Sequence, residues 1–159
     1  MAKVVSSGFD GLAALFGELA DHSGDVAAAA VYAGAGLMAD KLRSSLDNLQ
    51  VEDSREHKTK SVLPYEKEAL QNGMVITKFI RDKGRGFTQT SITFKGRSDH
   101  RTESFPDGVP TILLARAITK GTTFRIANRF IPNTANRNRK AVEQLMAETT
   151  EREFMKHIK

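Results

Sequence analysis

Residues 25–49 read DVAAAAVYAGAGLMADKLRSSLDNL, and this stretch decides the fold. Its apolar residues recur every three or four positions, which predicts one long amphipathic helix. Residues 27–36 are almost all Ala and Gly, and Gly34 and Gly36 each cost about 1 kcal/mol relative to Ala inside a helix. Small side chains offset that cost only where another backbone comes close. We therefore expect a close neighbour, either in the same core or across a subunit boundary.

A shorter apolar pattern precedes this helix. Its spacing of i, i+3, i+4 and i+7 predicts one apolar stripe on a helical arm within residues 1–24. We expect His22, Ser23 and Gly24 to end this arm, with Ser23 capping the helix that follows. The stripe consists of Leu12, Leu15, Phe16 and Leu19.

Proline and glycine mark the ends of the later helices. Pro64 predicts a helix start, because a proline at the first helical position forfeits only a hydrogen bond that is missing anyway, and Asn-Gly at 72–73 predicts its end. A second short helix is expected from Pro110, with Gly121 just beyond its last residue. A final helix is expected to follow Pro132.

Two candidate strands lie between the short helices. Residues 74–80 are rich in β-branched and aromatic side chains, and residues 87–94 alternate between two faces. The glycine-rich connection between them suits a hairpin. Helices at both ends of the chain around a small, mostly antiparallel sheet predict an α+β fold. We expect a single domain over residues 1–159, in which the arm (1–24) precedes the α+β domain (25–159) and irregular loops lie near 50–61 and 95–108.

The amino-acid composition excludes several classes of site and of membrane protein. The chain has 159 residues, a net charge of +5 and no cysteine. The absence of cysteine excludes disulfides, a thiol nucleophile and zinc sites built on thiolates. No apolar run approaches the roughly 18–20 residues that cross a bilayer, and the N-terminus lacks a signal-peptide pattern. We therefore expect neither a membrane partner nor export.

Nothing in the sequence predicts catalysis. The four histidines lie far apart, and the one local cluster of possible metal ligands, Asp99, His100 and Glu103, is interpreted as a solvated loop. No Gly-x-Ser-x-Gly motif is present. Carboxylate pairs such as Glu66 and Glu68 stand two positions apart, which points them away from each other on a helix. We expect no enzyme activity, no metal and no cofactor.

The charge is unevenly distributed. Residues 1–50 carry three basic and six acidic groups, a net charge of −3, whereas residues 51–159 carry a net charge of +8. Two copies could use this asymmetry head to tail, with acidic face against basic face. The alternative is that a small fold simply segregates its helices by charge.

Nucleic-acid binding is the main alternative function. Clustered cations can neutralise phosphates and give a steep salt dependence. However, the chain shows no recognition helix of a known motif and no exposed aromatics at stacking spacing. The possible phosphate contacts are Lys83 and Arg85 in the hairpin connection, and Arg137, Arg139 and Lys140 near the start of the last helix.

The order of motifs from residue 26 onward resembles a known family. LLARAITKGTT at 113–123 is followed by NRFIP at 128–132 and by a closing helix rich in Ala, Glu and Met. Upstream, ADKLR at 39–43 ends the alanine-rich helix, and PYEKEAL at 64–70 follows. This layout is similar to that of the small neck and tail-completion proteins of long-tailed bacteriophages and prophages.

The resemblance implies a structural role in the virion. It predicts a non-enzymatic protein of the neck that finishes the tail or joins it to the head, after assembly in the host cytoplasm. The implied partners are other copies of the chain in a ring of about six, the tail tube or tail terminator, the head connector, and passing DNA without sequence reading. A monomer recruited to its partner remains open. The residues implied in structure or interface are Arg116, Gly121, Thr122, Phe130 and Pro132.

Overall fold

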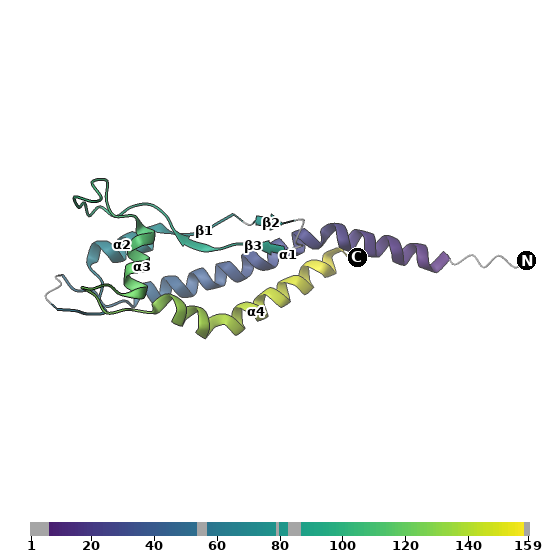
Figure 1. The fold of residues 1–159 in the computed structure, drawn as a ribbon. Coiled ribbons are helices and arrows are strands. Elements are labelled where there is room, and N and C mark those ends of the chain that lie inside the picture. Colours follow the sequence, from purple (N-terminus) through teal and green to yellow (C-terminus); the bar gives the residue numbers. More distant parts are fainter. Residues whose placement is uncertain (1–6, 54–56, 79, 83–86, 158–159) are drawn as a thin grey trace, which may run out of the picture.

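Two long helices run antiparallel along most of the molecule (Figure 1). The structure is a computed structural model that describes residues 7–53, 57–78, 80–82 and 87–157. The shorter helices and part of the small antiparallel sheet gather at one end of the long pair, which we call the base (Figure 1). The α+β prediction is confirmed. The helices are α1 (Ser7–Asp47), α2 (Pro64–Gly73), α3 (Thr111–Lys120) and α4 (Phe130–His157).

The predicted break near residue 23 is wrong, because α1 is a single continuous helix. Gly24 costs only about 1 kcal/mol inside a helix. Ending and restarting the helix there would instead leave unsatisfied backbone groups on both sides. The arm is therefore continuous with the rest of α1. Here "the arm" means residues 7–21, of which only the backbone is described.

The hairpin is present, but each predicted strand is divided in two. β1 (Met74–Ile76) pairs with β4 (Ile92–Phe94), and β2 (Ile80–Asp82) pairs with β3 (Phe87–Gln89). Between the two ladders, Thr77 N–H donates to the Ser91 carbonyl at 2.8 Å, and the Thr90 hydroxyl donates to the Thr77 carbonyl at 2.6 Å. The Thr90 hydroxyl thus takes the place of a regular backbone ladder bond, as Ser and Thr side chains often do.

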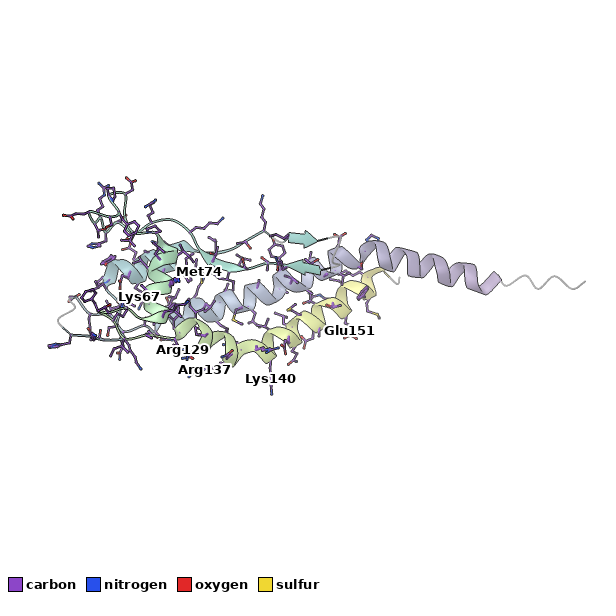
Figure 2. The ribbon with its side chains drawn as sticks, in the orientation of Figure 1. Lys67, Met74, Arg129, Arg137, Lys140 and Glu151 are labelled. Atoms are coloured by element: carbon purple, nitrogen blue, oxygen red, sulfur yellow. The ribbon has the colours of Figure 1, made fainter. Side chains whose placement is uncertain are left out.

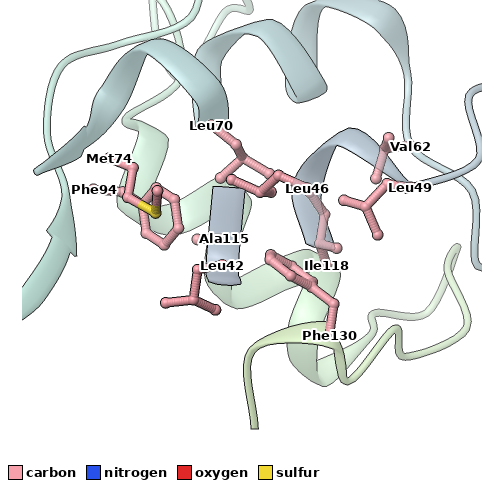
Figure 3. Packing of buried hydrophobic residues seen from close by; sticks show 10 residues of the cluster. All are labelled: Leu42, Leu46, Leu49, Val62, Leu70, Met74, Phe94, Ala115, Ile118 and Phe130. Carbon is pink, nitrogen blue, oxygen red and sulfur yellow. The ribbon is translucent and has the colours of Figure 1, made fainter. Parts of the chain in front are cut away.

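The apolar core lies at the base (Figure 3). The C-terminal half of α1 crosses it, and α2, α3, β1, β4 and the first residue of α4 enclose it. Leu46, Leu70 and Ile118, each from a different helix, are fully buried. Phe130 closes the cluster and fixes the start of α4.

Helices α1 and α4 pack closely at Gly34. A Cβ atom on Gly34 would lie 2.7 Å from Met146 Cγ, so the expected close approach occurs within the chain. At Gly36, by contrast, the described residues outside the backbone of α1 leave the corresponding position open to 4 Å, so the expected close neighbour is not found there. Because antiparallel helices rise equally, α4 ends level with about residue 23 of α1. The arm therefore extends beyond the end of α4 (Figure 1).

Candidate docking groove

An apolar hollow opens beside the core, between the C-terminal half of α1, β4, α3 and the start of α4. We call it the groove. Its volume is about 350 Å³. Its apolar lining comes from Leu42, Ile92, Phe94, Ile112, Leu113 and Ile131.

Helix α3 carries apolar residues toward both the core and the groove, and the core residues Leu42, Phe94 and Ala115 also line the groove. Leu114, Ala115 and Ile118 are buried against the core. In contrast, Ile112 is 47% exposed and Leu113 is 41% exposed, and both line the groove. Stability of the single chain does not require apolar residues at exposed positions, and adjacent exposed apolar residues in a hollow are typical of interaction sites.

The open side of α3 continues into positive charge. Arg116 and Lys120 line the groove and follow Ile112 at intervals of four residues, which places all three on one helical face. Neither cation makes an ion pair within the described part of the chain, and no acidic side chain lines the groove there. The groove thus combines an apolar lining with two cationic side chains, those of Arg116 and Lys120.

One polar atom in the groove also lacks a partner. Thr119 Oγ1 is buried and makes no hydrogen bond to any described residue. Buried hydroxyls are usually hydrogen-bonded, so an unsatisfied one at the wall of an open groove suits an incoming donor or acceptor.

A second hollow of about 310 Å³ meets the groove at Ile92, which lines both. It is lined on α1 by Val31, Ala35 and Met38 and on α4 by Val142 and Met146, among others. No charged residue lines it.

The two hollows together follow one side of α1. Val31, Ala35, Met38 and Leu42 recur along this side at helical spacing. Strand β4 pairs with β1 alone among the described strands, so its other edge has no strand beside it.

Of the residues singled out by resemblance, Arg116 alone lines the groove. Gly121 ends α3 with φ +77°, and its N–H donates to the Ala117 carbonyl at 2.9 Å. The φ of Gly121 is positive, but its ψ is 171°, so its backbone is extended rather than left-handed helical. A Cβ on Gly121 would lie 2.9 Å from Ala127 N.

Thr122 and Pro132, which the resemblance also singles out, lie in the turn after α3 and in the first turn of α4. The Thr122 hydroxyl accepts the N–H of Phe124 at 3.2 Å, and Phe124 itself is 76% exposed. Pro132 lies in the first turn of α4, where a missing N–H costs nothing. Both residues therefore position the helices and do not line the groove.

The five cations predicted as possible phosphate contacts differ in their surroundings. Arg137 and Lys140 are exposed, and Figure 2 shows them on the outer side of α4. Arg139 Nε donates to a Glu143 carboxylate oxygen at 2.7 Å, and this contact raises the pKa of Arg139. Arg137 also lines a polar pocket with Lys60. Lys83 and Arg85 lie outside the described residues.

Sequence reasoning missed a buried ion pair at the base. The Arg125 guanidinium donates to a Glu66 carboxylate oxygen, and both side chains are 3% exposed. The same Glu66 oxygen accepts the Leu63 N–H at 2.9 Å. The pair joins the start of α2 to the turn after α3. It spans 59 positions of sequence, and no local pattern indicates it.

Possible metal ligands are dispersed over the described residues. Within them, no three His, Asp or Glu side chains are grouped so as to hold a metal ion. His100 instead stacks on Tyr65, with ring centroids 4.4 Å apart. No described helix has the length and apolar character of a membrane span. In the comparisons with known proteins, no family model, curated protein or solved structure matches this chain.

Proposed function

We propose that this protein is a non-enzymatic structural subunit that acts by docking to other copies and to neighbouring proteins. Its proposed place is the neck of a tailed bacteriophage virion, where it completes the tail or joins it to the head. The place rests on the resemblance of residues 113–123 and 128–132 to the neck and tail-completion family. The mode of action rests on the structure of the groove.

The groove is the observation that carries the proposal. It holds two partly exposed apolar residues, Ile112 and Leu113, beside cations that have no ion pair in the described part of the chain. Burying such side chains against a partner contributes about 25 cal/mol per Å² of apolar surface removed from water. A ring component needs a docking surface of this kind, because cyclic assembly joins one face to a different face of the next copy.

Light scattering coupled to size-exclusion chromatography tests the proposal. We expect the mass to rise with protein concentration toward a discrete ring-sized oligomer at low and at moderate salt. Electron microscopy of the largest species should then show closed rings. A monomer at every concentration would contradict the ring.

DNA binding is the second candidate, and the exposed side of α4 favours it. Arg137 and Lys140 have no ion pair among the described residues, and Lys60 lines a pocket with Arg137. If DNA were the main partner, affinity for random duplex would fall steeply between low and moderate salt. Replacing Arg137 and Lys140 by Gln would then reduce both the affinity and the salt slope. A ring component should instead bind DNA feebly and keep its self-association in that double variant.

A further inference from the structure

We infer that the arm of one copy binds the groove of the next copy. This inference rests on the proposed assembly role and specifies the two surfaces that meet. It follows from the apolar pattern of the arm, the charges of the two surfaces and their separation within one chain.

The arm carries a sequence suited to the groove. Its stripe of Leu12, Leu15, Phe16 and Leu19 lies on a backbone that is helical throughout. This spacing gives a helix one continuous apolar side. A helix laid into an apolar groove through such anchors is a common mode of protein recognition. The groove and the second hollow together border α1 from Val31 to Leu42, and both are lined mainly by apolar side chains.

The charges of the two surfaces are opposite. Residues 7–21 contain Asp10, Glu18 and Asp21 and no basic residue. The groove is edged by Arg116 and Lys120, with no acidic side chain among its described lining residues. Complementary charge of this kind favours correct pairing and orientation. It also disfavours arm-to-arm contact, where acids would face acids.

The arm cannot reach the groove of its own chain. Helix α1 continues without a break from Ser7 to Asp47, so the arm points away from the base (Figure 1). Residue 21 and Leu42 are separated by about 32 Å along the helix axis. An arm that fills a groove must therefore come from another copy.

This geometry also fixes the kind of assembly. The arm and the groove are different surfaces near opposite ends of one chain, so their contact is heterologous, head to tail. Each copy then offers one free arm and one free groove, and assembly gives a ring if the rotation between copies closes and an open filament if it does not.

Two complementary variants test the inference. An arm variant carries Leu15→Ser and Phe16→Ser, and a groove variant carries Ile112→Ser and Leu113→Ser. The groove positions are exposed, so folding should survive, and circular dichroism melting checks this for each variant. Each variant alone should lose self-association by tenfold or more. The control Met155→Ser changes an exposed apolar residue of α4 outside the groove and should associate like the wild type.

Mixing the two variants gives the decisive result. The intact arm of the groove variant should bind the intact groove of the arm variant, and light scattering should show a 1:1 dimer that grows no further. Variants that still associate alone, or a mixture that stays monomeric, would overturn the inference.

The wild-type chain tells the possible failures apart. If the wild type associates but the mixed variants do not, the arm–groove contact is wrong and the assembly role stands. If the wild type remains monomeric as well, both the arm–groove contact and the self-assembly of the free chain are contradicted.

A charge exchange tests orientation independently. Arg116→Glu with Lys120→Glu should weaken self-association. Adding Asp10→Lys and Glu18→Lys in the same chain should restore it, because the arm and the groove are again opposite in charge. If the fourfold variant associates no better than the double variant, the arm and groove charges do not face each other, and the inference is wrong.

Discussion

The two ends of α1 lie in contrasting surroundings. At the base, Leu42 and Leu46 are buried among residues of α2, α3, β4 and α4. At the other end, the arm extends past the last residue of α4 (Figure 1). One helix therefore contributes stability at its C-terminal end and offers a free segment at its N-terminal end. Substitutions should separate these roles, changing stability at the base and self-association at the arm and groove.

The largest loss of stability should come from the buried ion pair. Arg125→Met removes the guanidinium that faces Glu66 and leaves a buried carboxylate without its cation, at a cost of about 3–5 kcal/mol. Urea unfolding followed by circular dichroism measures this loss. The matched control is Arg139→Met, which breaks the exposed pair with Glu143 and should leave the free energy of unfolding nearly unchanged, because solvent screens an exposed ion pair. Similar losses in both variants would contradict the structural importance of the buried Glu66–Arg125 ion pair.

The two sides of α3 should respond in opposite ways. Ile118→Ala leaves a cavity in the core and should lower the free energy of unfolding by about 2–5 kcal/mol. Leu113→Ala removes a partly exposed side chain and should cost less than about 1 kcal/mol. Self-association should show the reverse order. Without denaturant, the Leu113→Ala variant should associate more weakly than the wild type, whereas the Ile118→Ala variant should remain folded and associate normally. Chemical unfolding and light scattering on the same samples compare the two effects.

The end of α3 should tolerate no side chain. Gly121→Ala places a Cβ at a position with φ +77° and within 2.9 Å of Ala127 N, so we expect a loss of about 1–3 kcal/mol. Thermal melting measures it. An unchanged melting temperature would mean that the turn after α3 adopts another conformation in solution.

The smallest effect should be a gain. Gly36→Ala adds a methyl group where no atom lies within 4 Å, and it should stabilise α1 by up to about 1 kcal/mol. Gly34→Ala is the control, because its Cβ would meet the Met146 side chain, which would have to move. Thermal melting should therefore rise for Gly36→Ala and not for Gly34→Ala. Equal gains in both variants would show that α1 and α4 are not closely packed at Gly34.

Local patterns predicted the elements that depend on neighbouring residues. Pro64 starts α2 because its ring suits a first helical turn, and Gly121 ends α3 because its backbone must adopt a positive φ. The alternation of residues 87–94 correctly indicated a strand. Its division at Thr90 was missed, because a hydroxyl that replaces a ladder bond does not disturb the apolar pattern.

Long-range packing set the features that the sequence did not reveal. Ser23 and Gly24 indicated a helix break, but their local preference is smaller than the cost of interrupting α1. The Glu66–Arg125 pair and the groove both join segments that are far apart in sequence. The hydrophobicity of Ile112 and Leu113 was evident, but only the packing of α3 shows that these residues face outward.

The absence of cysteine allows a direct measurement of the arm–groove contact. One chain would carry Leu15→Cys in the arm, and a second, separately tagged chain would carry Leu113→Cys in the groove. The account predicts that mild oxidation of the mixture forms a disulfide between the two chains in high yield. It also predicts little cross-linking when Met155→Cys replaces Leu113→Cys. Equal yields for the two pairings, or no cross-link with either, would contradict head-to-tail assembly through the arm and the groove.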